Sequence, residues 1–133
     1  FTMKTYYLDS NAILRYFLGD IEPQYEKVEQ CLLKAKKGQV RVNLCSEVIM
    51  EVEFVLRKFY DLPRKKIVKL LLGLIKNSYI KIDNINELLE VINLFEDINI
   101  DFVDVLLFVR AKNDGAEVLS FDKDFKRLEK LVG

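Results

Sequence analysis

The sequence predicts an α/β fold, a three-layer α/β/α domain with a short-stranded, mainly parallel central sheet. Short segments rich in β-branched and aromatic residues alternate with longer segments whose apolar residues recur at helical spacing. Strands separated by helices are joined by crossover connections, and these connections build parallel sheets that helices cover. Half of the 133 residues are apolar. We therefore expect one domain over residues 3–133, large enough to bury a core without disulfides.

The first strand is expected at residues 4–8, where K-T-Y-Y-L precedes the helix-capping cluster Asp-Ser-Asn at residues 9–11. Apolar residues at helical spacing predict helices over residues 12–18 and 22–37. Gly38 ends the second of these helices, because glycine adopts the left-handed conformation common after a helix.

The same order of elements then recurs. Residues 40–44 alternate V-R-V-N-L, which predicts a strand, and Ser46 caps a helix that runs to Phe59. Pro63 opens a further helix to about residue 77, since proline is tolerated in a first turn. Residues 79–82 are expected to form a third strand.

The remaining elements are two helices, a strand and a terminal helix. Helical spacing predicts helices over residues 86–96 and 102–114, the second of them preceded by Asp101 as its cap. Residues 117–120 are expected to form a last strand before a helix that begins near residue 123.

The chain contains no histidine, which excludes several kinds of catalytic site. Ser-His-Asp and Cys-His systems, metalloproteases with an HExxH motif and histidine-assisted nucleases all need an imidazole. The two cysteines, Cys31 and Cys45, form no CxxC pair and are expected to be free thiols. Catalysis therefore has to rely on carboxylates, lysines, hydroxyls or a bound metal.

Carboxylates stand where ligands bind in such sheets, beyond the carboxyl ends of the strands. Asp9 follows the first predicted strand, and Asp122 follows the last by two residues. Glu51 and Asp104 lie within apolar helical segments, where an unpaired carboxylate is costly to bury. Carboxylates brought close together repel unless a cation neutralises them, and oxygen ligands favour Mg²⁺ or Mn²⁺.

Each of these acids also has a purely structural interpretation. Asp9 can cap the first helix, and Asp104 can be a first-turn acid that the helix dipole favours. Asp122 and Asp124 can cap the last helix, and Glu51 can pair with a lysine. For one acid alone the structural interpretation is favoured, whereas the four together favour a site. Glu47, one helical turn before Glu51, is the alternative active-site glutamate.

Four segments in the right order resemble a known family. They are Y-L-D-S-N-A-I-L-R-Y-F-L-G-D (7–20), S-E-V-I-M-E-V-E-F-V-L-R-K-F-Y (46–60), D-F-V-D-V-L-L (101–107) and V-L-S-F-D-K-D-F (118–125). Together they resemble PIN domains of the VapC toxin type, over nearly the whole chain. The resemblance implies a Mg²⁺- or Mn²⁺-dependent endoribonuclease, the toxin of a toxin–antitoxin pair, with RNA as substrate, a homodimeric assembly and a small antitoxin protein as partner.

The resemblance also assigns the site residues one by one. The family's acidic positions fall on Asp9, Glu51, Asp104 and Asp122. The auxiliary residues are Asn11, Ser120 and Asp124. In this interpretation Asp9, Asp104 and Asp122 hold the metal, and Glu51 orients the attacking water.

The neutral net charge conceals a segregated charge pattern. Residues 57–81 contain eight Lys or Arg against one acid, and residues 82–109 contain seven acids and no base. A basic segment attracts phosphate, although a solvated helix face explains it equally well. Our candidates for substrate binding are Arg15, Lys58 and Arg64.

Three other functions compete with a nuclease. A receiver-like phosphoryl-handling domain would need an acid after the middle strand and a lysine after the last one, and the last predicted strand ends in Ser-Phe-Asp. A haloacid-dehalogenase-like phosphatase would place a second aspartate where Asn11 stands. A non-catalytic RNA- or protein-binding PIN module is the third alternative, and the complete set of acids argues against it.

The expected location of the protein follows from its targeting and membrane signals. No signal peptide is recognisable, and no apolar run approaches the ~18 residues of a membrane span. We expect a cytoplasmic protein without a membrane partner. Phe1 and Thr2 precede a methionine, and we expect the native chain to begin at Met3.

Overall fold

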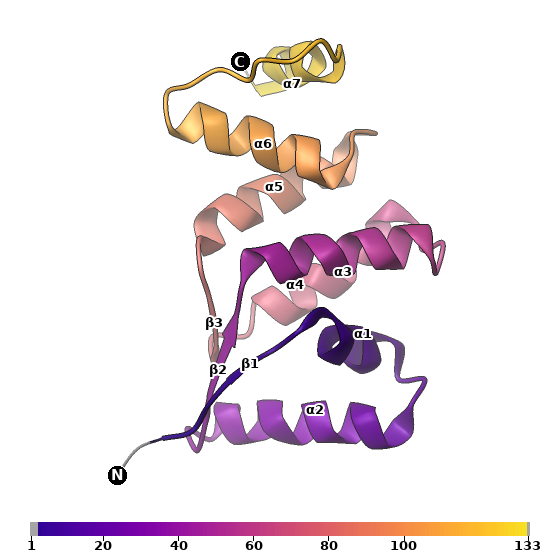
Figure 1. Ribbon diagram of the computed structural model, residues 1–133, viewed down its shortest axis with the longest axis vertical. Helices are drawn as coiled ribbons and strands as arrows, with labels where there is room; N and C mark the ends of the chain where they lie inside the picture. The colour runs from indigo at the N-terminus through magenta and orange to yellow at the C-terminus, as the bar shows by residue number, and fades with distance from the viewer. Residues whose placement is uncertain (1–2, 133) are drawn as a thin grey trace. The chain divides into compact units, whose positions relative to one another are not determined.

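The computed structural model of the protein describes residues 3–132 (Figure 1), so our expectation about Phe1 and Thr2 lies outside the described residues. Within the described part, the chain forms two compact units, and the boundary between them in the sequence falls after Ile85. We call them the N-terminal unit and the C-terminal unit. The single domain over residues 3–133 stays a prediction.

The sheet belongs to the N-terminal unit. Its strands among the described residues are β1 (Thr5–Tyr7), β2 (Arg41–Leu44) and β3 (Ile80–Ile82), in the order β1-β2-β3. Both pairings are parallel; Tyr7 lies opposite Asn43, and Leu44 lies opposite Ile82. The predicted short parallel strands are therefore confirmed here, and the residues after all three lie at one edge of the sheet.

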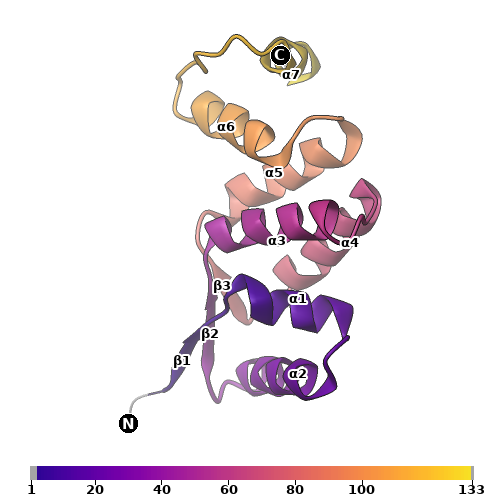
Figure 2. The ribbon, with the colours of Figure 1, turned by 45° about the vertical axis from the view of Figure 1, so that its right-hand side comes forward.

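Four helices connect these strands: α1 (Ser10–Leu18), α2 (Glu22–Lys36), α3 (Ser46–Lys58) and α4 (Arg64–Ile75). All four lie on the same side of the sheet in both ribbon views (Figures 1 and 2). This follows from the handedness of parallel crossovers, because two right-handed connections made in the same direction cover the same face.

The core of the N-terminal unit is built from the apolar faces of α3 and α4 and from alternate strand residues. On α3, Ile49, Val52 and Leu56 are completely buried, at the three- and four-residue spacing of a helix face. The buried residues of α4 and the strands that join them are Ile67, Val68, Leu71, Leu74, Ile75, Val42, Leu44, Ile80 and Ile82.

The C-terminal unit consists of helices α5 (Ile85–Asp97), α6 (Phe102–Asn113) and α7 (Asp124–Val132). The rings of Phe95 and Phe102 meet edge to face, with centroids 5.1 Å apart, across the short connection between α5 and α6. Both rings are buried, and so is Leu128 on α7. The three predicted helices are therefore present, and their predicted boundaries differ from the observed ones by at most one residue.

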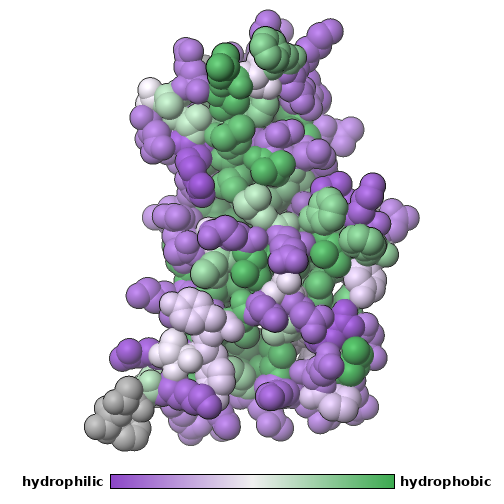
Figure 3. Space-filling view, viewed as in Figure 1, coloured by the Kyte–Doolittle hydropathy of each residue, from purple (hydrophilic) through white to green (hydrophobic). Residues whose placement is uncertain are grey.

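The predicted last strand at residues 117–120 is wrong. Among the described residues this segment has no strand partner, and Leu119 and Phe121 are 97% and 103% exposed. Apolar residues are visible on the surface of the C-terminal unit, at the top of the space-filling view (Figure 3). A strand exists only if its backbone pairs with a neighbour, and local β propensity cannot supply that neighbour.

No helix within residues 3–132 is both long enough and apolar enough to span a lipid bilayer.

A buried ion pair sits on α3. The carboxylate of Glu53 is only 2% exposed, and it accepts a hydrogen bond of 2.8 Å from Nε of Arg57, one turn further along the helix. A carboxylate buried in this way needs a positive partner, because desolvation disfavours its charged form.

Replacing Arg57 is therefore expected to destabilise the protein. Arg57→Gln leaves Glu53 buried without its cationic partner and should lower the free energy of unfolding by about 2 kcal/mol, less than for a fully buried pair because Arg57 is partly exposed. Urea denaturation measures the change. Lys58→Gln, at the exposed neighbouring position, is the control and should change stability by less than about 0.5 kcal/mol; equal effects in both variants would contradict the prediction.

Candidate metal and active site

Asp9 lies at the carboxyl edge of the sheet, two residues after β1. Its Oδ1 accepts a hydrogen bond of 2.8 Å from the backbone N–H of Ala12 and so caps α1. The structural role expected of this residue is therefore present. The cap uses Oδ1, so it is compatible with a ligand bound through Oδ2. Asn11 is exposed on the first turn of the same helix.

Arg15, one of the candidates for substrate binding, is held within the N-terminal unit. Its side chain is 12% exposed; one guanidinium nitrogen lies 2.8 Å from a carboxylate oxygen of Asp20, and the other donates to the hydroxyl of Tyr60 at 3.1 Å. These contacts tie α1 to the segment after α3. Any contact of Arg15 with a substrate stays a prediction.

The glutamates of α3 differ sharply in their surroundings. The expectation that Glu51 is buried among apolar residues is wrong, since Glu51 is exposed and Glu53 is the buried carboxylate. The reason is the angular position of each residue around the helix axis. Residues 49, 52, 53 and 56 form the inward face of α3, and position 51 lies off that face. Glu47 is also exposed, and its carboxylate accepts from Oγ of Ser46 at 3.2 Å.

Three carboxylates converge in the C-terminal unit. Asp104 on the first turn of α6, Asp122 before α7 and Asp124 at the start of α7 each offer an oxygen, and these oxygens all lie within 4.8 Å of one another. Asp104 and Asp122 were predicted as metal ligands, and Asp124 as an auxiliary residue.

The backbone of the loop before α7 is held by short-range hydrogen bonds. Oγ of Ser120 accepts from the N–H of Asp122 at 3.0 Å, and Oδ1 of Asp122 accepts from the N–H of Asp124 at 2.9 Å. Oδ1 of Asp124 in turn accepts from Arg127 at 3.1 Å. Ser120 thus orients the loop that presents the acids, and the capping role expected of Asp122 is present as well.

The neighbouring carboxylates affect the pKa of Asp104. The pKa of Asp104 is raised above its ordinary value of 3.8, first by burial and then by the negative charges of Asp101, Asp122 and Asp124. The charged form of Asp104 is therefore disfavoured in the metal-free protein. A cation placed between the three carboxylates would remove that penalty.

The donor set fits a hard divalent cation. All three side chains offer carboxylate oxygens, and Mg²⁺ and Mn²⁺ prefer oxygen ligands. Neither described cysteine, Cys31 or Cys45, belongs to the group, so nothing in it selects for zinc or copper. The cluster is thus suited to Mg²⁺ or Mn²⁺.

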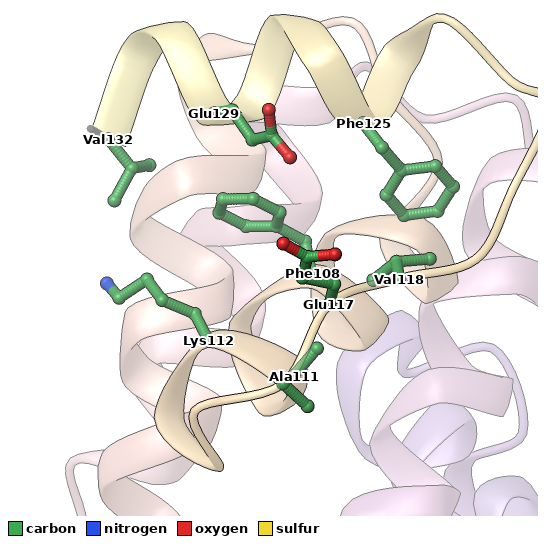
Figure 4. A pocket seen from close by; sticks show the side chains of 9 residues that line it. Phe108, Ala111, Lys112, Glu117, Val118, Phe125, Glu129 and Val132 are labelled. Carbon is green, nitrogen blue, oxygen red and sulfur yellow. The ribbon is translucent and has the colours of Figure 1, made fainter.

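A separate cavity of about 310 Å³ lies between α6, residues 116–118 and α7. The rings of Phe108 and Phe125 form much of its wall, with the carboxylates of Glu117 and Glu129 near them (Figure 4). No predicted site residue lines this cavity. Val118 contributes to its wall instead of pairing in the sheet.

The remaining basic candidates lie at helix ends of the N-terminal unit. Lys58 is the exposed last residue of α3, and Arg64 is the half-buried first residue of α4. Lys65, Lys66 and Lys69 are exposed on α4 near Arg64, so the basic segment recognised in the sequence is solvent-accessible.

One polar residue at the sheet edge was not among the predicted site residues. Asp83 directly follows β3, and its Oδ1 accepts from the backbone N–H of Ser46 at 2.9 Å. The rule that identified Asp9, an acid directly after a predicted strand, would also have found it.

Comparison with known proteins places this arrangement in a family. Residues 6–131 match the PIN domain family, and the chain belongs to that family. It is 27% identical over 122 residues to a VapC ribonuclease of Aquifex aeolicus (strain VF5), covering 91% of this chain and 90% of the relative. No solved structure gives a significant match. The recognised family and the predicted α/β/α fold class are thereby confirmed.

The structure brings part of the predicted site together. Asp104, Asp122 and Asp124 form one cluster in the C-terminal unit, whereas Asp9 and Glu51 belong to the N-terminal unit, one at the sheet edge and one on α3. A catalytic set of four acids stays a prediction.

Replacing one acid of the cluster is expected to stabilise the metal-free protein. Asp104→Asn removes a negative charge that is disfavoured first by burial and then by the neighbouring acids, so it should raise the melting temperature in EDTA at neutral pH. Because the folded-state pKa of Asp104 is raised, the wild-type protein loses stability as the pH rises through that pKa. The gain from Asp104→Asn should therefore be largest at neutral pH and shrink as the pH falls toward 3.8.

Scanning calorimetry with and without metal measures these effects. Millimolar Mn²⁺ should raise the melting temperature of the wild-type protein, because binding to the folded state relieves the repulsion, and Asp104→Asn should reduce that rise. Glu117→Gln removes an exposed carboxylate outside the cluster and serves as the control. Identical melting curves for all three proteins in EDTA would contradict the predicted repulsion.

Proposed function

We propose that this protein is a metal-dependent endoribonuclease and the toxin of a toxin–antitoxin pair. The observation that carries the proposal is the convergence of Asp104, Asp122 and Asp124 within 4.8 Å, in a chain that belongs to the PIN domain family. The name of the relative from Aquifex aeolicus, VapC ribonuclease, supports RNA as the substrate.

The cofactor that we propose is Mg²⁺ or Mn²⁺, held by Asp104 and Asp122 together with Asp9, with Asp124 in an auxiliary role. Such a cation supplies Lewis-acid stabilisation for negative charge that builds up on a phosphate and favours ionisation of a water. The protein's own task is to hold the carboxylates at fixed positions, which the cap of α1 does for Asp9 and the hydrogen bonds of residues 120–124 do for Asp122 and Asp124. Asp104 is held by its place on the first turn of α6.

Glu51 is proposed to orient the attacking water and to accept its proton as general base. It is exposed, so it is accessible to solvent, and the rigid helix α3 fixes its backbone position. A carboxylate in that position can accept a proton from the attacking water as the water approaches the phosphorus. Asn11 can orient the substrate or a water from the first turn of α1, where its amide is exposed.

RNA binding is proposed for the basic segment of the N-terminal unit. Lysines and arginines neutralise phosphates and release counterions, which contributes sequence-independent affinity. Lys58 and Arg64 lie at the start of this segment, at the end of α3 and the beginning of α4. Arg15, tied to Asp20 and Tyr60, would have to exchange one of these contacts to reach a phosphate.

The proposed partners are a small antitoxin protein and a second copy of the chain, in the cytoplasm. They follow from the proposed toxin role and from the family. Membership of the PIN family argues against the receiver-like and haloacid-dehalogenase-like alternatives. The acid cluster favours a catalytic role over a non-catalytic module, because it holds Asp104 where burial and the neighbouring acids disfavour its charge.

Purified protein is expected to cleave RNA with divalent metal. Incubation with a structured RNA pool and Mg²⁺ or Mn²⁺ should give fragments with a 5′-phosphate and a 3′-hydroxyl, as hydrolysis by water predicts. EDTA and Asp9→Asn should each abolish cleavage, because both remove metal binding. Equal cleavage in all samples would refute the proposal, because the cleavage would then depend neither on the metal nor on Asp9.

Variants of the two exposed glutamates of α3 test which of them is catalytic. Glu51→Gln should lower kcat about 100-fold or more, because it removes the general base. Glu47→Gln changes the same group one turn earlier on the same helix and should leave kcat nearly unchanged. Single-turnover cleavage of a short RNA measures both, and the reverse order of effects would make Glu47 the active-site glutamate.

A further inference from the structure

Helix α3, which carries Glu51, begins without a capping side chain of its own. The N-cap position is occupied by Cys45 in an extended conformation (φ −85°, ψ 141°), and its side chain makes no capping hydrogen bond. The first N–H groups of a helix need acceptors, and Ser, Thr, Asp or Asn supply them at most N-caps. The acceptor for this helix therefore has to come from elsewhere.

Asp83 supplies it from the end of the neighbouring strand. Its Oδ1 accepts from the backbone N–H of Ser46, the first residue of α3, at 2.9 Å, and its Oδ2 lies 3.5 Å from Oγ of Ser46. Ser46 is only 4% exposed, so its N–H has little access to water. The negative charge of Asp83 also stands at the positive end of the helix dipole.

The sheet register explains why a residue 37 positions away reaches the helix start. Leu44 lies opposite Ile82 in the parallel pairing of β2 and β3, so the residues directly after both strands leave the sheet at the same level. Asn84 follows in a left-handed conformation (φ 53°), which asparagine tolerates better than most residues. The chain turns away there, beyond the Asp83 carboxylate that contacts Ser46.

We propose that Asp83 is a positioning residue for Glu51, an inference that rests on the proposed ribonuclease function. Glu51 follows Ser46 by five residues, about 7.5 Å along the helix axis. The contact between Asp83 and Ser46 fixes the start of α3 to the end of β3, in addition to the covalent connection from β2. Asp83 acts through the helix and has no contact with substrate in this role.

The contact also involves a second carboxylate. Oγ of Ser46 carries one proton and lies 3.2 Å from Oε1 of Glu47 as well as 3.5 Å from Asp83. The serine donates to one of the two acids at a time, and the shorter distance favours Glu47. The backbone N–H of Ser46, which has no such choice, is therefore the group that holds Asp83.

Three variants separate positioning from simple helix capping. Asp83→Ala removes the acceptor. Asp83→Asn keeps a side-chain oxygen, since asparagine caps helices as well as aspartate does. Asp83→Ala combined with Cys45→Ser gives α3 a local cap but leaves β3 detached from the helix. Glu26→Ala, which removes an exposed carboxylate from α2, is the control.

Positioning predicts a specific pattern of effects. Asp83→Ala should lower kcat about tenfold with KM little changed, because it loosens the helix that positions a catalytic group. Asp83→Asn should keep kcat within about twofold of the wild-type value. The double variant should regain the melting temperature lost in Asp83→Ala while kcat stays low. Hydrogen exchange at the Ser46 N–H should be faster in Asp83→Ala and unchanged in Glu26→Ala.

Other patterns would overturn the proposal. If the double variant regains both stability and kcat, Asp83 only stabilises the helix. If Asp83→Ala keeps the wild-type kcat, or if exchange at Ser46 does not change, the contact does not position Glu51. An inactive wild-type protein would refute the proposed function and the catalytic role of Asp83 with it, whereas an active wild type with a fully active Asp83→Ala variant refutes the role of Asp83 alone.

Discussion

The parallel pairing of β2 with both of its neighbours is the constraint on which the N-terminal unit depends. Because Tyr7 lies opposite Asn43 and Leu44 lies opposite Ile82, the chain leaves all three strands at one edge. That single fact places Asp9 at the start of α1, Ser46 at the start of α3 and Asp83 beside Ser46. Two of the three residues are acids, and both accept backbone N–H groups at helix starts. Capping and a role in a site are therefore compatible at this edge.

The C-terminal unit meets a different physical demand. It keeps three carboxylates within 4.8 Å although burial and mutual repulsion raise the pKa of Asp104. The cost is offset locally, since Ser120 and Asp122 hold the loop backbone and Arg127 contacts Asp124. Acids arranged in this way are more typical of functional sites than of packing, because packing alone would select against the repulsion.

The helices and the parallel strands of the N-terminal unit were predictable because their signals are local. Apolar spacing, capping residues and glycine stops lie within a few residues of one another. The prediction of a strand at residues 117–120 was wrong, because pairing depends on a distant neighbour that local β propensity does not reveal. For Glu51, a run of apolar residues predicted burial, yet burial on a helix depends on rotation, and position 53 faces inward. The contact between Asp83 and Ser46 depends on sheet register, which no local pattern contains.

The cluster of Asp104, Asp122 and Asp124 also connects two segments of the chain that are distant in the sequence. Asp104 lies on the first turn of α6, Asp122 just before α7 and Asp124 at its start, so a cation shared by them would close a loop of about 18 residues. Unlike a disulfide, such a cation binds only the folded chain and stabilises it by mass action, in a protein whose described cysteines are free. The concentration of metal would then determine how firmly α7 is held to α6. One ion would serve in catalysis and would also stabilise the contact between these two helices.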